Sequence, residues 1–136
     1  MRQDLAAHKN LCTLAYWHQP RFTSGILDNP ASVDAFWRDV AAAGVELVLS
    51  GHTHIYERFA PLDADGKASD TGVREFVVGS GGKSHHPIVK VASGSEVRNN
   101  DTFGVLELTL RPTSYDWRFV PEAGRTFTDS GSSPCH

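Results

Sequence analysis

Residues 45–54 read Val45-Glu46-Leu47-Val48-Leu49-Ser50-Gly51-His52-Thr53-His54. The apolar run over residues 45–50 has the length and the β-branched content of a buried strand, and Gly51 allows a sharp backbone turn where that strand ends. Two histidines, one residue apart, follow the turn. Imidazole is a good ligand for zinc, iron, manganese and copper, so His52 and His54 are candidate metal ligands.

A second apolar run over residues 11–17 ends in His18 in the same way. Between the two runs the sequence predicts a helix, with Asn29 as the N-cap, Pro30 at the first helical position and Gly44 at the end. Apolar side chains recur there with helical spacing, at Val33, Phe36, Trp37, Val40 and Ala41.

Strand, helix and strand in succession predict an α/β fold with a βαβ unit over residues 1–58, whose two strands run parallel. Parallel strands end at the same edge of a sheet, where open α/β folds bind their ligands. We therefore expect His18, His52 and His54 at one rim. The alternative is that each histidine is an incidental loop residue, but the same placement after two successive strands favours a metal site.

Two longer segments contain these histidines, Tyr16-Trp17-His18-Gln19-Pro20-Arg21-Phe22 and Gly51-His52-Thr53-His54-Ile55-Tyr56-Glu57-Arg58-Phe59. In motif and spacing they resemble the C-terminal half of calcineurin-like metallophosphoesterases, in particular the purple acid phosphatase-like branch. The segment over residues 72–82 and the strands after it are also similar, so the resemblance extends over nearly the whole chain.

This resemblance implies the C-terminal half of a four-layer αββα sandwich that hydrolyses phosphate esters. It implies a dinuclear centre of Fe, Zn or Mn, in which His18 and His52 bind one metal and His54 binds the other. A hydroxide that bridges the two metals would be the nucleophile.

The family takes its remaining ligands from upstream motifs, namely two aspartates, one of them in a Gly-Asp pair that bridges the metals, and an asparagine in Gly-Asn-His. The sequence contains no Gly-Asp pair and no Gly-Asn-His. We therefore expect that the N-terminal half of the domain is missing, with Met1 either an internal methionine or the start of a shortened reading frame. The chain would be a hydrolase portion that is inactive alone. The alternative is a non-catalytic metal-binding or interaction fragment.

Residues 59–121 are expected to be mainly β and to begin with a polar loop over residues 59–72. Residues 122–136 are expected to form a loose polar tail. Strands are predicted over residues 73–78, 88–91, 102–110 and 114–120. We expect one incomplete domain over residues 1–136.

Two further segments are candidates for phosphate or substrate binding. Gly79-Ser80-Gly81-Gly82 could cradle a phosphate, or it could be a glycine turn that lets the chain pass close to the rim. His85 and His86 are candidates for substrate binding, or else part of a polar surface loop.

Cys12 and Cys135 are the two cysteines. Cys12 lies too far before His18 to be a ligand, and Cys135 lies in a polar tail with no core of its own. We expect a disulfide between them, with a buried free thiol at Cys12, or a partner cysteine in the missing half, as the alternatives. A disulfide, together with the export that is common in the resembling branch, predicts an extracytoplasmic or secreted protein, although residues 1–17 contain no signal peptide.

The composition argues against nucleic-acid binding and against a membrane span. The 136-residue chain has a net charge of −3 and no basic stripe, so we do not expect it to bind nucleic acid. It has no apolar run long enough to span a membrane.

Overall fold

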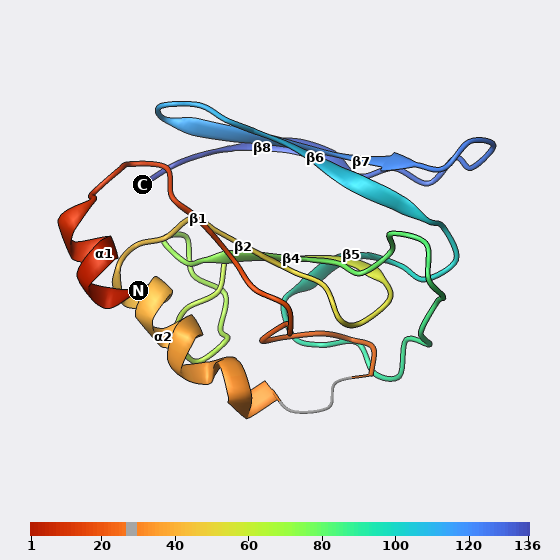
Figure 1. Cartoon of the computed structure of the whole chain (residues 1–136), viewed down its shortest axis with the longest axis horizontal. Helices are drawn as coiled ribbons and strands as arrows, with labels where there is room; N and C mark the ends of the chain where they lie inside the picture. Colours follow the sequence, from red (N-terminus) through yellow and green to blue (C-terminus); the bar gives the residue numbers. More distant parts are fainter. Residues whose placement is uncertain (27–29) are drawn as a thin grey trace.

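The computed structural model describes residues 1–26 and 30–136, so the expected N-cap Asn29 lies outside the described residues. The described chain forms three layers (Figure 1). A five-stranded sheet is covered on one face by a helix, α2 (Asp34–Ala42), and on the other face by a three-stranded sheet. The structure is thus a mixed α/β fold.

The five-stranded sheet has the order β1-β2-β4-β3-β5. Its strands are β1 (Leu14–Tyr16), β2 (Leu47–Ser50), β3 (Tyr56–Phe59), β4 (Arg74–Val78) and β5 (Ser95–Asn99). The other sheet is antiparallel and consists of β6 (Gly104–Leu110), β7 (Ser114–Pro121) and β8 (Ser130–Pro134). A short helix, α1 (Arg2–Ala7), precedes β1, and a 3₁₀ turn, η1 (Pro30–Val33), precedes α2.

The predicted parallel pairing is confirmed, because β1 pairs parallel with β2. Alternate residues of β2 face opposite layers, as expected for a strand that is buried on both faces. Val48 packs in the cluster that contains Trp37 of α2, whereas Leu47 packs with Trp117 of the second sheet. The sheet therefore has a hydrophobic core on each side, and its β1 and β2 ends are fixed side by side.

The predicted helix is present, although it starts with the 3₁₀ turn and becomes α-helical at Asp34. Trp37 and Val40 are fully buried, and Gly44 ends the helix with φ of 68°. Phe36 differs from the expectation. It is 46% exposed and lies against Trp17 at the edge of the sheet, 6.1 Å between ring centroids.

Three of the four predicted strands are present as β4, β6 and β7, one was wrong, and two strands of the first sheet were not predicted. Residues 88–91 form no strand, because the backbone N–H groups of Val89 and Lys90 donate to the carbonyl of Ser24 rather than to a sheet. The structure instead has β3 and β5, which pair antiparallel with each other. The sequences of β3 and β5 contain charged residues, which have a low β-propensity, so these two strands are identified only by their pairing.

The prediction of a loose tail was also wrong, since β8 pairs with β7 along its whole length. Asp129 lies just before β8 and joins the two sheets. Its carboxylate accepts hydrogen bonds from the Tyr56 hydroxyl (2.7 Å), from the Arg58 guanidinium and from the Trp117 indole (3.2 Å). Burial acts to raise the pKa of Asp129, but the hydrogen bonds from Arg58 and Tyr56 outweigh it and hold that pKa below its ordinary value.

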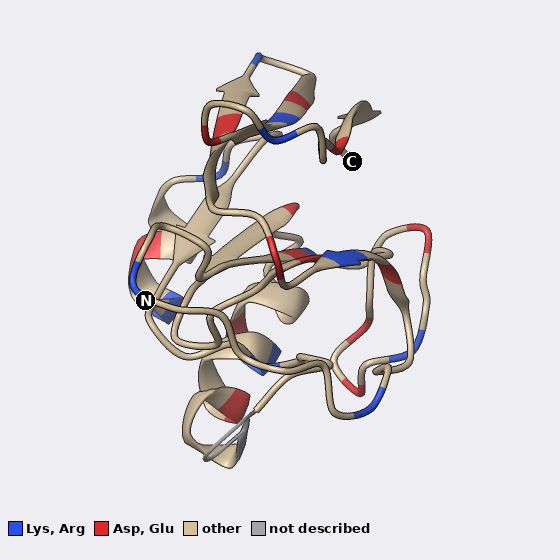
Figure 2. Ribbon diagram, turned by 90° about the vertical axis from the view of Figure 1, so that its right-hand side faces the viewer, with Lys and Arg blue, Asp and Glu red and all other residues tan. Residues whose placement is uncertain are grey.

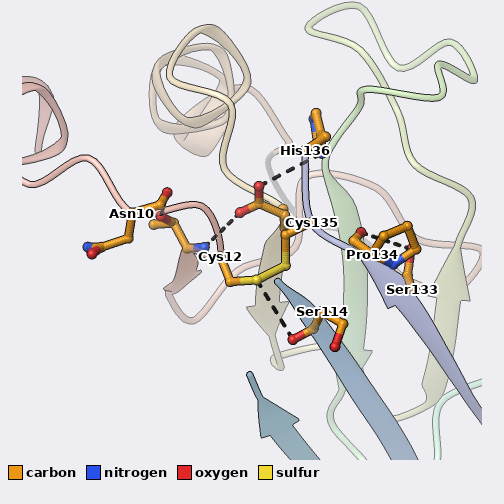
Figure 3. Close-up of a disulfide and its surroundings, with 9 residues drawn as sticks. Asn10, Cys12, Ser114, Ser133, Pro134, Cys135 and His136 are labelled. Carbon is orange, nitrogen blue, oxygen red and sulfur yellow. Dashed lines mark hydrogen bonds and ion pairs between the residues drawn. A yellow bond between two sulfur atoms is a disulfide. The ribbon is translucent and has the colours of Figure 1, made fainter. Parts of the chain in front are cut away.

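A disulfide joins Cys12, just before β1, to Cys135 at the end of β8, with 5.4 Å between their Cα atoms (Figure 3). Next to the two cysteines in sequence, Thr13 and His136 both contact Glu46, whose carboxylate accepts a hydrogen bond from the backbone N–H of Thr13 at 2.6 Å and lies 3.8 Å from the ring of His136. The disulfide therefore fixes the second sheet to the N-terminal edge of the first. It is consistent with an extracytoplasmic location.

Basic and acidic residues are interspersed along the ribbon (Figure 2). No helix among the described residues is both long enough and apolar enough to cross a membrane.

Removing the disulfide should destabilise the fold. The variant Cys12→Ser/Cys135→Ser should lose up to about 4–5 kcal/mol of unfolding free energy, because the bond restricts a loop between residues 123 positions apart. Urea unfolding of the two proteins measures the difference. Reductant should bring the wild type to the value of the variant and leave the variant unchanged. Two alkylatable thiols in protein made in an oxidising compartment would contradict the bond.

Candidate metal centre

His18 and His52 meet at the rim where β1 and β2 end. Their rings lie edge to face with 5.0 Å between centroids, and Nδ1 of His52 is 3.0 Å from Nε2 of His18. The backbone N–H of Gly51 donates to the carbonyl of His18 at 3.0 Å, which ties the two loops together beside the rings. Two of the three candidate ligands therefore lie together.

The backbone at His52 is in the left-handed region, with φ of 56°. It is the one non-glycine residue among those described with a positive φ. Such conformations are uncommon outside glycine, although histidine tolerates them better than bulky residues, and they gather at functional sites. The turn after Gly51 thus presents the His52 ring to His18 at some cost in backbone strain.

The spacing of the two rings suits a shared cation. Two ligand nitrogens, each about 2.0–2.1 Å from one ion, lie about 3 Å apart when the angle between them is near 90–110°. The observed 3.0 Å falls in that range. Two imidazole lone pairs this close would repel, so the pair must share a proton or a metal ion. His18 and His52 therefore fit as two ligands of one metal.

His54 has different neighbours. Its Nδ1 lies 2.7 Å from the hydroxyl of Ser84, and its ring stacks on His86 with 4.0 Å between centroids. Partial burial lowers the pKa of His54, and the nearby His86 and Lys83 lower it further. A lowered pKa favours the neutral imidazole, which is the form that binds metals.

In residues 1–26 and 30–136, no three His, Cys, Asp or Glu side chains are close enough together to hold one ion. The described residues thus supply a histidine pair and a separate third histidine.

The two substrate candidates lie apart from each other. His86 packs on His54, whereas the ring of His85 stacks on Phe103 with 4.0 Å between centroids. Nothing in the sequence singles out Ser84, because a single serine in a polar loop has no characteristic pattern.

A buried carboxylate holds the loop that carries His18. Glu75 of β4 accepts hydrogen bonds from the backbone N–H groups of Arg21 (2.9 Å) and Phe22 (3.0 Å) and from the hydroxyl of Ser50 at the end of β2 (3.0 Å). Burial raises the pKa of Glu75 to about 7, against the effect of these three hydrogen bonds. Glu75 therefore anchors the ends of both strands from below the rim.

A second buried carboxylate, Glu57 of β3, anchors the same loop further along. It accepts hydrogen bonds from the backbone N–H of Ser24 (2.7 Å) and from the hydroxyls of Thr23, Ser24 and Ser95. Glu57 and Glu75 were not predicted as site residues. A charged residue in a short segment is expected at the surface. Only the fold shows that Glu57 and Glu75 are fully buried.

Gly79 allows the end of β4 to pack against the histidine turn. Its N–H donates to the carbonyl of Ile55 at 2.9 Å, and a Cβ there would lie 1.9 Å from the carbonyl oxygen of Thr53. The close approach accounts for glycine at this position as a packing requirement.

No family model matches the sequence, and a search of curated proteins found no match. A purple acid phosphatase, PPD1 from yellow lupin (Lupinus luteus) seeds, has a similar structure, with a TM-score of 0.77 and 20% identity over 96% of this chain and 27% of that chain. GAP50, the anchor in the inner membrane complex of Plasmodium, is also similar, with a TM-score of 0.77 and 19% sequence identity. The match covers 99% of this chain and 41% of GAP50.

These likenesses show the fold. The chain has the fold of part of a purple acid phosphatase and of part of GAP50, and it spans less than half the length of either structure.

Adding a methyl group at Gly79 should disturb the histidine turn. Gly79→Ala should lower the unfolding free energy by about 1–3 kcal/mol or more, because its Cβ would collide with the backbone at Thr53. Gly81→Ala is the matched control, since a Cβ at Gly81 would meet nothing within 4 Å. Thermal denaturation of both variants measures the difference, and equal stabilities would contradict the close packing.

Glu75 should make stability depend on pH. The pKa of Glu75 is higher in the folded protein, about 7, than in the unfolded chain, where it is near 4.5. The stability that this difference contributes is therefore complete below about pH 4.5 and is lost as the pH rises to about 7. The unfolding free energy of the wild type minus that of Glu75→Gln should therefore fall by about 3 kcal/mol over that range.

Urea unfolding at several pH values measures this difference. Glu107→Gln, on the exposed part of β6, is the control and should follow the wild type. A difference that is constant or rises with pH would contradict the raised pKa.

Proposed function

We propose that this chain is the C-terminal, histidine-bearing portion of a dinuclear-metal phosphoesterase that hydrolyses phosphate esters. His18 and His52 bind one metal, and His54 binds the other. The observation that carries the proposal is the 3.0 Å approach of the first two rings at the rim of a fold similar to a purple acid phosphatase. The sequence motifs around the three histidines support the same assignment.

The metals would be two ions of Fe, Zn or Mn, which acidify a water molecule and neutralise charge on the phosphoryl group when bound. The residues of this chain hold the ligand rings at the rim. Glu75 and Glu57 fix the loop of His18, and the turn after Gly51 presents His52. Neither glutamate serves as a ligand here, because both carboxylates already accept hydrogen bonds from the loop.

The centre needs further ligands from outside these residues. Two cations a few ångströms apart repel strongly, and neutral imidazoles do not offset that repulsion. In the proposal, carboxylates come from an N-terminal half of the same domain. β1 is the outermost strand on its side of the sheet, and its Tyr16 side chain is 80% exposed, so this edge is available for a further strand.

A second candidate is a non-catalytic metal-binding or interaction protein. It is favoured by the similarity to GAP50, which is an anchor, and by the lack of a three-ligand group among the described residues. In both cases the disulfide supports an extracytoplasmic location for this protein.

Metal binding tests the proposal directly. The chain should bind cobalt(II) with a stoichiometry of one, because Nε2 of His18 and Nδ1 of His52 already lie at ligand spacing. His52→Ala and His18→Ala should abolish binding, and His8→Ala, an exposed histidine just after α1, should leave it unchanged. Titration followed by visible absorption measures the stoichiometry. Full binding by His52→Ala would contradict the assignment.

The same proteins separate the two candidate functions. The isolated chain should not hydrolyse an aryl phosphate, whereas co-expression with the N-terminal half of a structurally similar phosphatase should give metal-dependent turnover that His52→Ala removes. Metal-dependent turnover by the isolated chain would refute the idea that the centre is incomplete. No turnover from a co-purifying complex that holds two metals would favour the non-catalytic candidate.

A further inference from the structure

The loop after β4 contacts His54 at four places. The Ser84 hydroxyl lies 2.7 Å from Nδ1 of His54, and the two rings of His54 and His86 stack at 4.0 Å with 21° between their planes. A backbone-to-side-chain hydrogen bond and a backbone-to-backbone hydrogen bond complete the contact. The N–H of His54 donates to Nδ1 of His86 at 3.2 Å, and the N–H of His86 donates to the carbonyl of His54 at 3.1 Å.

We propose that Ser84 and His86 are positioning residues that fix the orientation and the tautomer of His54. In the proposed arrangement the Nδ1–H of His54 donates to Ser84 Oγ, which leaves the lone pair of His54 on Nε2 as the ligand atom. His86 covers one face of the ring and holds its backbone. The ligand role of Nε2 rests on the proposed function, whereas the tautomer and orientation are properties of this chain alone.

The chemistry of histidine explains why such residues matter. Each neutral imidazole has one N–H and one lone pair, and the hydrogen bond made by one nitrogen decides which nitrogen can bind a metal. A ring with no such partner exchanges between tautomers and rotates about its Cβ. Outer residues that remove this freedom typically change metal affinity by roughly 10–100-fold.

His86 acts through its own lone pair. Because Nδ1 of His86 accepts the backbone N–H of His54, the ring of His86 is fixed in the plane that allows stacking. Together the two hydrogen bonds between His54 and His86 and the stack of their rings hold residues 84–86 and the histidine turn as one unit. The ring of His85 instead stacks on Phe103.

The adjacent histidines therefore provide a matched pair of variants. In metal-free protein labelled with ¹⁵N at histidine, long-range ¹H–¹⁵N spectra at about pH 8 should show His54 as the Nδ1–H tautomer. Ser84→Ala should shift it toward the Nε2–H tautomer, and Ser84→Thr, which keeps the hydroxyl, should restore the wild-type state. His86→Ala should move the ring resonances of His54, whereas His85→Ala should leave them in place.

Cobalt(II) affinity at the His54 side of a completed two-metal centre gives the second readout. Ser84→Ala and His86→Ala should weaken it roughly 10–100-fold, and His85→Ala should not. A His54 that is mainly Nε2–H in the wild type, or whose tautomer is the same in Ser84→Ala, would overturn the positioning role. The expected tautomer without any metal binding would support the positioning role and count against the proposed function.

Discussion

Two buried carboxylates beneath the rim are the constraint on which the site depends. Glu57 and Glu75 lie on neighbouring strands, are fully buried and accept hydrogen bonds from the loop that follows β1. A buried carboxylate without partners costs several kcal/mol, and each hydrogen bond to a charged group contributes about 1.5–3 kcal/mol. The loop of His18 and the two glutamates therefore stabilise each other, and the ring of His18 faces His52 as a consequence.

The rest of the molecule supports this rim from two directions. At the rim itself, Gly79 brings the end of β4 into contact with the histidine turn, and residues 84–86 hold His54. At the opposite end, the disulfide fixes the second sheet to the start of β1, and Asp129 connects the two sheets through Tyr56 and Trp117. The histidine loops thus belong to a packed structure rather than to a free surface, which suits preorganised ligands.

The sequence predicted the parts of the fold that depend on local patterns. Buried parallel strands read as apolar runs, so β1, β2 and the placement of His18 and His52 at one rim could be predicted, as could the helix that ends at Gly44. The strands β3, β5 and β8 could not be predicted, because these polar segments form strands only through pairing with their neighbours. The roles of Glu57, Glu75 and Ser84 are equally invisible in sequence, since each depends on partners far away in the chain.

We infer that the buried glutamates hold His18 against His52 before any metal binds. A scalar coupling through the N–H···N hydrogen bond between Nε2 of His18 and Nδ1 of His52, measured by ¹⁵N NMR on metal-free protein, tests it most directly. We expect the coupling in the wild type and its loss in Glu75→Ala, while that variant remains folded. A wild type without the coupling, with both rings averaging as free histidine does, would contradict it.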